Sequence, residues 1–547
     1  MNKVEKRFYL YLLIWVLADL LQAVFTNMHA DEAYYALYGQ FLDWGYYDHP
    51  PMVALLTYLS HFVGMGALSV RFCTVLLHGA TIWLVWKTLA RVNASVRDVN
   101  EFFIIAFSLF MFVLYGFITT PDGPLLFFTA LFFYLYQQYL KKDSILLAIL
   151  AGVTMAAMLY SKYMAVLVIG FVLLSNIKLL KDWKIWLAGI IALALFMPHI
   201  LWQINHDFPS LKYHFLLRKD PFSWAYILEF LPNQLLVFNP VCLFLAFYFC
   251  WKERQNKDRF TRACVFTCVG FILFFWVMIV NGHAEPHWTI AISIPMLFLL
   301  FRNTRKELWQ KRILRFILPM SILVLFVRIG LCTPFVPDIT GFGNYQPAMN
   351  AIHKQSGHTP VVFYNSFQKP SLYRYYTGEN GMALSSLYNR QTQYDILQLD
   401  KDLQGKEVMA VLEYLNTDYH QVENYDYYCR KFEHFQGTNR IEVQVENQRV
   451  ERDSVILEVT INNPYAVPFD FCHPELPVRI YAAYLQEDHY HLEKCEDIDI
   501  QVIPAGDKVN TQLRFKYIPE QLCVICLANF SNISVNSQAI SLNQYRQ

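Results

Sequence analysis

Long apolar runs separated by short polar segments fill the chain up to about residue 332. Most runs approach the roughly 20 residues that an α-helix needs to cross a bilayer, and some are shorter. Only Ser161 and Lys162 separate the fifth run from the sixth. The pattern predicts eleven spans, at 8–28, 66–86, 102–119, 123–140, 145–160, 163–180, 185–204, 233–251, 263–281, 288–302 and 312–332.

The pattern changes after residue 332, where apolar runs shorten and polar residues become frequent. Residues 333–437 predict a small α/β module, because the strand-like TPVVFY precedes a helical pattern and KEVMAVLEYL resembles another strand. Residues 438–547 hold six alternating stretches separated by turn residues, as in a β-sandwich. The predicted fold class is therefore a polytopic α-helical membrane protein, residues 1–332, followed by these two extracytoplasmic regions.

Lysine and arginine favour one side of this layout. With eleven spans, the basic segments all fall on the side of the N-terminus, which the positive-inside rule assigns to the cytoplasm. MNKVEKR precedes a long apolar run without a small-residue cleavage site, which predicts a retained first helix. We therefore expect a multi-pass protein of the cell inner (plasma) membrane, with everything after residue 332 in the periplasm.

The composition supports a membrane protein. Hydrophobic residues make up 55% of the 547 residues and charged residues 16%, and the net charge of +1 gives no reason to expect nucleic-acid binding.

Five of the eleven cysteines lie in apolar segments, and the other six would permit disulfides outside the cytoplasm. Cys523 and Cys526 resemble a C-x-x-C motif, but on a strand they would face opposite ways, which argues against a redox or zinc role.

The most unusual stretch follows the first span and reads HADEAYYALYGQFLDWGYYDHPPMVALLTYL, residues 29–59. It opens with Asp31 and Glu32 at the end of an apolar segment and is rich in aromatic residues. One interpretation is a polar interfacial loop with aromatic belt residues. The other is a functional site, because ionisable groups at membrane depth usually have a role. Its further candidate residues are Tyr34, Tyr35, Asp48 and His49 before the Pro50–Pro51 turn.

Other ionisable residues lie at predicted outer ends of spans. Asp122, in ITTPDGPLLFF, fits either a helix N-cap or an active-site acid. Lys162, in YSKYMAVL, could bind an anion or extend toward the interface. Arg71 lies on the outer side, against the charge bias of the other loops. Asp19, inside the first span, is isolated in the sequence and receives no role.

Two further motifs lie between spans. NGHAEPHW contains His283, Glu285, His287 and Trp288, and its H-x-E-x-H spacing suits a divalent metal but also a short polar turn. LWQINHDFPSLKYHF fits an amphipathic loop. Acids and cations at the same outer ends suit sugar transfer from a phosphate-bearing lipid. A carboxylate can deprotonate an acceptor hydroxyl, and cations can hold the departing phosphate.

At these motifs the chain resembles the GT-C glycosyltransferases of the protein-mannosyltransferase and lipid A aminoarabinose-transferase superfamily. It is most similar to the bacterial dolichyl-phosphate-mannose-protein mannosyltransferase-like branch. The resemblance covers about residues 1–330 and rests on the stretch from DEAYY to MVALL, followed in the family's order by SVRF, TTPDGPLLFF, SKYMAVL, LWQINHDFPSLKYH and HAEPHW. His49 departs from the Lys of aminoarabinose-transferase relatives, so the sugar and the acceptor stay open.

The resemblance implies a catalytic carboxylate at Asp31, with Glu32 beside it and a second acid at Asp122. It also implies a polyprenyl-phosphate-sugar donor and products of inverted anomeric configuration. Lys162, Arg71 and His49 are predicted to bind the donor phosphate, and Tyr35, Asp48, His283, Glu285, His287 and Trp288 to bind substrate.

The acceptor is a hydroxyl of a lipid, a glycan or a protein, and membrane lipid is the other expected partner. These motifs specify no certain cofactor, and a divalent metal stays an alternative. Two other functions compete with transfer. One is a transporter or flippase of a lipid-linked saccharide, which should have polar residues along a path through the bundle. The other is a non-catalytic anchor for the sandwich, which would not need acids at several span ends.

Overall fold

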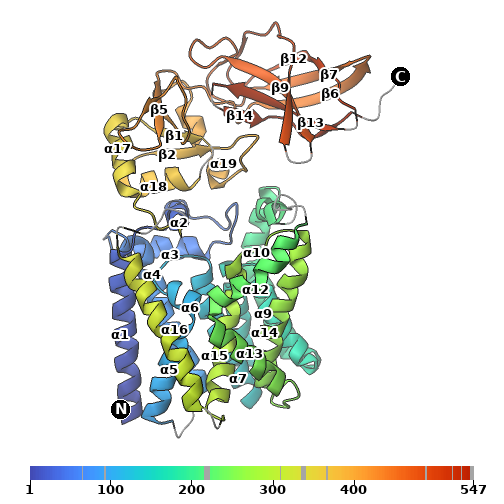
Figure 1. Ribbon diagram of the computed structural model, residues 1–547. Coiled ribbons are helices and arrows are strands. Elements are labelled where there is room, and N and C mark those ends of the chain that lie inside the picture. Colours follow the sequence, from blue (N-terminus) through green and yellow to red (C-terminus); the bar gives the residue numbers. More distant parts are fainter. Residues whose placement is uncertain are drawn as a thin grey trace. The chain divides into compact units, whose positions relative to one another are not determined.

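The structure is a computed structural model that describes residues 1–64, 66–90, 94–214, 222–307, 310–333, 335, 340–364, 367–486, 489–519, 521–530 and 532–542. It divides into two compact units, Met1–Asn344 and Tyr345–Gln547. The first unit is a bundle of helices, and the second combines helices with several sheets (Figure 1).

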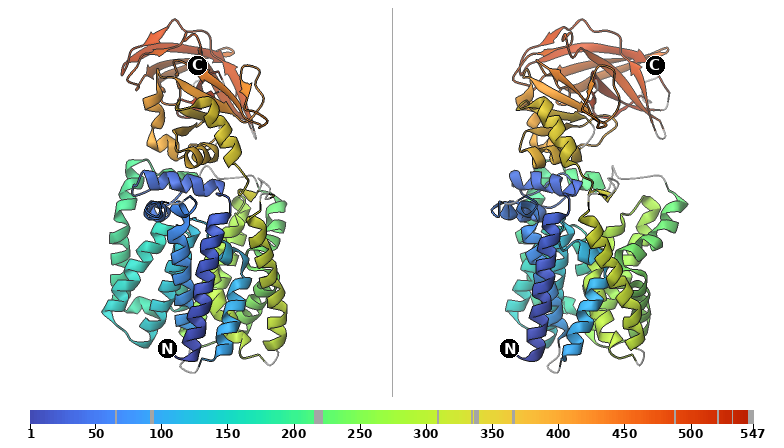
Figure 2. Two further views of the ribbon diagram at one scale, coloured as in Figure 1. Left: turned by 90° about the vertical axis from the view of Figure 1, so that its left-hand side faces the viewer. Right: turned by 60° about the vertical axis from the view of Figure 1, so that its left-hand side comes forward.

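The first unit has a helix or a helix pair in each of the eleven predicted spans. Long helices run along the bundle, and two short ones lie across the end opposite the N-terminus (Figure 2). The two helices that lie across this end are α2 (Ala30–Gln40) and α3 (Met52–His61). The others are α1 (Lys3–Phe25), α4 (Leu68–Leu89), α5 (Val96–Ser108), α6 (Phe110–Leu114), α7 (Asp122–Lys141), α8 (Ile145–Ser161), α9 (Ala165–Ser175), α10 (Trp183–Asn205), α11 (Pro209–Lys212), α12 (Trp224–Phe238), α13 (Pro240–Glu253), α14 (Arg259–Met278), α15 (Ser293–Thr304) and α16 (Gln310–Leu331).

Five of these helices, α1, α4, α10, α14 and α16, are long and apolar enough to cross a membrane by themselves. A sixth span results if α12 and α13 are taken together, although they are bent by 102° at Asn239. The remaining predicted spans hold shorter or less apolar helices, such as the pair α5 and α6 broken at Leu109. The predicted break after Ser161 is confirmed, because α8 ends there and α9 begins at Ala165.

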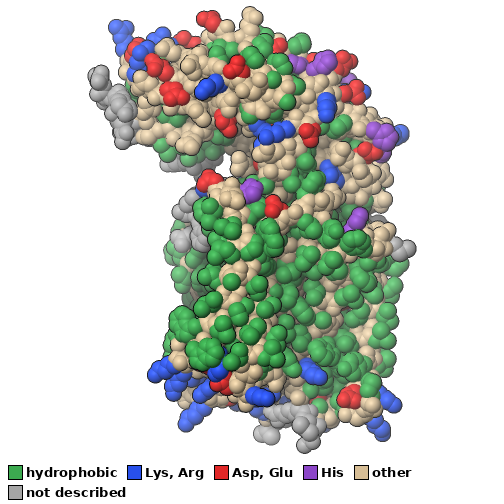
Figure 3. All heavy atoms as spheres, turned by 180° about the vertical axis from the view of Figure 1, so that it is seen from behind, with side chains coloured by type: hydrophobic (Ala, Val, Ile, Leu, Met, Phe, Trp, Pro, Cys, Tyr) green, Lys and Arg blue, Asp and Glu red, His purple; other side chains and the backbone are tan. Residues whose placement is uncertain are grey.

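Side-chain chemistry divides the surface of the helical unit. Hydrophobic side chains cover its flank, and lysines and arginines gather at the end that holds the N-terminus (Figure 3). Inside, buried aromatic rings from several helices pack together, for example Phe8 stacked on Trp86 at 5.2 Å between ring centroids. The bundle is thus apolar around its middle and basic at one end, as the sequence predicts.

The second unit begins with an α/β sheet. Its strands are β1 (Val361–Tyr364), β2 (Gly381–Leu384), β3 (Val408–Leu412), β4 (His420–Gln421) and β5 (Tyr428–Phe432), in the order β2-β1-β3-β5-β4. β1 runs parallel to both β2 and β3, whereas β5 is antiparallel to its neighbours. Three α-helices accompany the sheet, namely α17 (Gln346–Ser356), α18 (Gln368–Thr377) and α19 (Gln393–Leu397).

Antiparallel sheets form the rest of the second unit. One has the order β10-β9-β13-β14 with β15 beside β13, another has the order β12-β7-β6, and β8 pairs with β11. Val459 of β7 and Ile525 of β13 belong to one apolar core, as expected for two sheets packed face to face. These strands are β6 (Glu442–Glu451), β7 (Ser454–Asn462), β8 (Phe469–Asp470), β9 (Val478–Gln486), β10 (His489–Lys494), β11 (Val502–Ile503), β12 (Lys508–Lys516), β13 (Leu522–Asn529), β14 (Asn532–Val535) and β15 (Ile540–Ser541).

The cysteines carry free thiols. The structure describes all eleven, and none forms a disulfide. Cys523 lies in the core between the two sheets, and Cys526 lies in a separate cluster with Leu387 and Ala483. The two sulfurs therefore face opposite sides of β13, as predicted for residues three apart on a strand.

Candidate functional site

The candidate site is built around the first turn of α2. His29 is the N-cap residue: its Nδ1 accepts a hydrogen bond from the backbone N–H of Asp31 at 3.1 Å, and its own N–H donates to Glu32 at 3.2 Å. Gly341, at φ +77°, packs against the His29 ring, where a Cβ would overlap it. Because helix N-termini favour negative charge, this turn suits two adjacent carboxylates.

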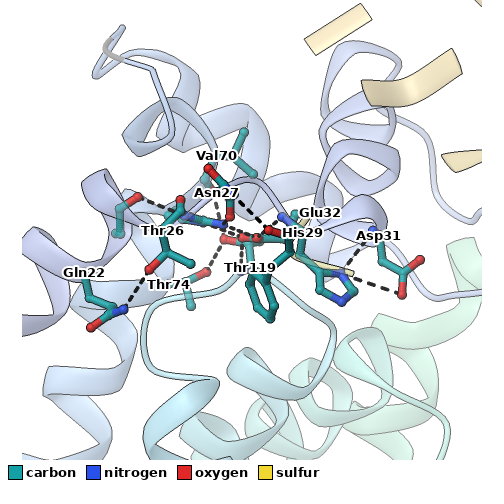
Figure 4. A network of polar contacts seen from close by, with 12 residues as sticks. Gln22, Thr26, Asn27, His29, Asp31, Glu32, Val70, Thr74 and Thr119 are labelled. Atoms are coloured by element: carbon teal, nitrogen blue, oxygen red, sulfur yellow. Dashed lines mark hydrogen bonds and ion pairs between the residues drawn. The ribbon is translucent and has the colours of Figure 1, made fainter. Parts of the chain in front are cut away.

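Glu32 and Arg71 form a fully buried ion pair, and both side chains are 0% exposed. Figure 4 shows Glu32 with His29 and Asp31 in the surrounding network of polar contacts. The Nε and Nη2 of Arg71 donate to the two oxygens of Glu32 at 2.8 and 2.5 Å. Nη1 donates to the carbonyls of Ala23 and Thr26 at 2.9 and 2.8 Å, and Nη2 also donates to that of Asn27 at 2.8 Å. One guanidinium thereby joins the end of α1, the start of α2 and the first turn of α4.

This geometry bears on two predictions. Arg71 was expected to bind the donor phosphate, but its five N–H donors are all used within the protein. Glu32 was expected beside Asp31 as a catalytic acid, but its carboxylate also accepts from the backbone N–H of Thr119 at 2.7 Å and has no exposed surface. In these positions both residues hold the first turn of α2 in place.

Asp31 differs from its neighbour in accessibility. Its side chain is 39% exposed, and its nearest Oδ lies 4.0 Å from the Nδ1 of His29. The backbone on both sides is fixed by the His29 cap and by the buried Glu32. The structure thus presents one accessible carboxylate on a rigid turn, which a general base requires.

Tyr35 follows on the same helix and lies among acidic groups. Its hydroxyl is 3.3 Å from the Nε2 of His49. Burial, followed by the negative charges of Asp31, Asp48 and Asp122, raises the pKa of Tyr35 well above its usual value. The hydroxyl therefore stays protonated at neutral pH and can donate to a ligand. The predicted residues Tyr35, Asp48 and His49 are brought together with the acids.

Asp122 and Lys162 form a second buried pair. The Lys162 Nζ donates to both carboxylate oxygens of Asp122 at 2.8 Å, which uses two of its three N–H donors. Asp122 is the first residue of α7, and Lys162 is the C-cap residue of α8. The two residues were predicted to act separately, as an acid and as a phosphate ligand, and the structure places them in one ion pair.

The segment 283–288 approaches the same acids. Its His287 ring packs edge-on against Tyr115, with centroids 6.4 Å apart, and Trp288 packs against Phe275. Tyr115 lies close enough to Asp122, Asp31 and Glu285 for their charges to act on its hydroxyl. Tyr115 was not predicted, because nothing in its sequence neighbourhood distinguishes it from an aromatic residue of a span.

The H-x-E-x-H spacing does not produce a metal-binding cluster. The Nε2 of His283 and the Oε2 of Glu285 are 4.0 Å apart, and the His287 ring is turned toward Tyr115. Among the residues that the structure describes, no group of three or more His, Cys, Asp or Glu side chains is arranged to hold a metal ion.

Trp202, Ser210 and His214 of the LWQINHDFPSLKYHF motif contact residues 43–48. Trp202 Nε1 donates to Asp43 at 2.7 Å, the Ser210 hydroxyl donates to the carbonyl of Tyr46 at 2.8 Å, and the His214 ring is 3.1 Å from the carbonyl of Asp48. A Cβ on Gly45 would overlap the indole of Trp202. Two motifs that are far apart in the sequence therefore form one wall of the site.

Asp19 is not isolated, contrary to the sequence interpretation. His78 Nδ1 lies 2.8 Å from one of its oxygens, and Arg328 Nη1 lies 2.9 Å from the other. Arg328 also donates to Gln22, whose amide donates to the hydroxyl of Thr26. This cluster links α1, α4 and α16 below the Arg71 contacts. The sequence shows the charged residues but not that they meet.

Comparisons with known proteins match large parts of this chain. Residues 48–202 match the family described as Dolichyl-phosphate-mannose-protein mannosyltransferase. The Lipid A galacturonosyltransferase RgtD of Rhizobium johnstonii is 23% identical over 286 residues, 49% of this chain and 59% of that protein. The Lipopolysaccharide core galacturonosyltransferase RgtB of the same organism is 28% identical over 201 residues, 34% of this chain and 40% of that protein. The alignments thus span less than two thirds of either relative.

A solved structure extends the match. ArnT from Cupriavidus metallidurans, crystallised with undecaprenyl phosphate, superimposes with a TM-score of 0.57 at 13% identity, covering 77% of this chain and 97% of that one. At this identity the match establishes the fold. The resemblance to GT-C glycosyltransferases that the sequence indicates is confirmed.

Proposed function

We propose that this membrane protein transfers a sugar from a polyprenyl-phosphate carrier to an acceptor hydroxyl, with inversion at the anomeric carbon. The GT-C fold, the relatives described as glycosyltransferases and the bound undecaprenyl phosphate of the ArnT structure support this proposal. The sugar and the acceptor class, a lipid, a glycan or a protein, are not specified by these similarities.

The contrast between Asp31 and Glu32 carries the proposal. Of two adjacent carboxylates, Glu32 is completely buried in an ion pair, whereas 39% of the Asp31 side chain is exposed. Asp31 takes the proton from the acceptor hydroxyl while that oxygen bonds to the anomeric carbon. The bond between that carbon and the phosphate oxygen breaks, and the polyprenyl phosphate leaves with the bonding electrons.

Lys162 and Asp122 are proposed to lie on the donor side of the reaction. The third N–H of Lys162 can bind a phosphate oxygen as negative charge develops there, and His49 lies beside Tyr35 as a further donor. Tyr35, Asp48, His283, Glu285, His287 and Trp288 remain proposed substrate contacts around the same acids.

The function is tested by incubating the purified chain in lipid nanodiscs with polyprenyl-phosphate sugars and an extract of envelope lipids and glycans. Mass spectrometry should show a product heavier than an acceptor by one sugar residue, together with free polyprenyl phosphate. Donor lipid that crosses between leaflets of sealed vesicles without forming a product would instead identify a flippase.

Lys162→Gln should weaken binding of the donor lipid. The loss of a hydrogen bond to a charged group costs about 1.5–3 kcal/mol, which corresponds to roughly 10- to 150-fold in Kd. The matched variant is Asp122→Asn, which should retain donor affinity because Lys162 keeps its charge. Titration of each variant with a fluorescent polyprenyl phosphate would measure both affinities. Equal weakening in the two variants would assign the pair a structural role.

We also propose that the end of the helical unit with α2 and α3 faces the periplasm. The gathering of lysines and arginines at the opposite end favours this orientation. A protease added outside spheroplasts should remove a tag fused after residue 547 and should leave a tag before residue 1 intact. Protection of the C-terminal tag would contradict both the orientation and a periplasmic second unit.

A further inference from the structure

A pocket of about 390 Å³ opens at the basic end of the helical unit, away from the candidate site. The final residues of α4, the last turn of α7, the last turn of α15 and the start of α14 enclose it. Its lining includes Lys87, Lys141, Arg302 and Asp258, with Leu140 and Phe260 as apolar walls. It therefore joins a charged rim to the apolar interior of the bundle.

The pocket has an excess of positive charge. Three cations from three helices face one carboxylate, Asp258, which is 3.3 Å from Arg302 and caps α14 through Thr261. Among the described residues, Lys87 and Lys141 have no carboxylate within ion-pair distance. Lys87 lies over the ring of Trp83 at 5.3 Å, and Lys141 contacts the amide oxygen of Gln137 at 3.3 Å.

Several other cations at this end of the bundle are paired. Arg305 contacts Asp98 at 2.9 Å, and Lys306 contacts Glu253 at 3.1 Å. A basic residue in the last turn of a helix also complements the helix dipole, which explains one cation for each helix. The helix dipole does not explain why cations from three helices converge on one cavity. Nor does it explain why two of these cations, Lys87 and Lys141, lack an acidic partner.

We propose that this pocket binds a phosphate-bearing anion, either the headgroup of an anionic membrane lipid or a soluble phosphate compound. Two lysine ammoniums and a guanidinium supply donors for phosphate oxygens. The volume leaves room for more than the phosphate alone, and the walls at Leu140 and Phe260 suit an attached apolar group. Basic pockets between helices at the cytoplasmic ends of membrane bundles are typical sites for anionic headgroups.

The test compares two doubly substituted full-length proteins. Lys87→Gln/Lys141→Gln removes the two cations without acidic partners and leaves all described ion pairs intact. Lys178→Gln/Lys181→Gln removes the same charge from exposed positions of the same end, outside the pocket lining. Native mass spectrometry would count retained phosphatidylglycerol, with zwitterionic phosphatidylcholine as reference, and thermal unfolding would verify that each variant is folded.

The wild-type protein and the second variant should retain phosphatidylglycerol over phosphatidylcholine, and the first variant should bind it about tenfold more weakly. Excess inorganic phosphate then separates the two sources. Displacement of phosphatidylglycerol supports the soluble phosphate compound, and persistence supports the lipid headgroup. Equal retention of both lipids by a wild-type protein that also retains no inorganic phosphate, or equal weakening in both variants, would overturn the proposal.

Discussion

Asp31→Asn should reduce sugar transfer by about 100- to 10,000-fold, the usual cost of losing a positioned general base. Asparagine preserves the shape of the side chain and cannot accept the acceptor's proton. The turn should still form, because His29 and Glu32 fix the backbone around position 31. Donor lipid should therefore still bind, and the loss should appear in turnover.

The control for this variant is Asp143→Asn, which removes a carboxylate that is 59% exposed and lies between α7 and α8, at the basic end of the helical unit. Transfer would be measured with purified proteins in nanodiscs at saturating donor, with donor affinity measured in parallel. Near-normal turnover of Asp31→Asn would refute its role as the base and would make Asp122 the next candidate. Equal losses in both variants would indicate a general effect of charge.

Arg71→Met should destabilise the helical unit by about 3–5 kcal/mol, the typical cost of removing one partner of a buried ion pair. The substitution leaves the Glu32 carboxylate buried without its cation and releases the carbonyls of Ala23, Thr26 and Asn27. Arg71→Lys should recover little, because an ammonium cannot replace the planar set of five donors. Transfer should fall as well, since the turn that carries Asp31 loses its anchor.

Thermal unfolding of the detergent-purified proteins, followed by the loss of monomer in size-exclusion chromatography, would measure this effect. The double variant Arg71→Met/Glu32→Gln should be more stable than Arg71→Met, because it no longer buries an unpaired charge. Wild-type stability of Arg71→Lys together with weakened donor binding would contradict the positioning role and would restore Arg71 as a phosphate ligand.

Much of the helical unit follows from local sequence. The apolar runs locate its helices because a membrane environment requires apolar side chains over the length of a helix. The count of spans does not follow, since α5 and α6 are broken at Leu109 and α12 and α13 bend at Asn239. The second break has a local signal, because Asn239 caps α13 ahead of Pro240. The break at Leu109 lies within an apolar run and depends on packing between helices, which local periodicity does not report.

The sequence also reveals the ionisable residues of the site but not their partners. Arg71, Glu32, Asp122 and Lys162 all stand out as charges at span ends. Whether a cation faces a ligand or a carboxylate depends on contacts between residues that are about 40 positions apart, such as Lys162 and Asp122. His29 escapes notice because Ser, Thr, Asp and Asn are the usual N-cap residues.

The Asp19 cluster has a consequence for the order in which the protein is made. Asp19 enters the membrane within the first helix, and its contacts come from His78 in α4 and Arg328 in α16. During synthesis, His78 emerges after a short interval and Arg328 only when the last helix is complete. Until then the carboxylate lacks its guanidinium partner. Closure of the bundle thus depends on a late ionic contact between its first and last helices, Asp19 of α1 with Arg328 of α16. In a chain truncated before α16, α1 should therefore be poorly anchored and open to quality-control proteolysis.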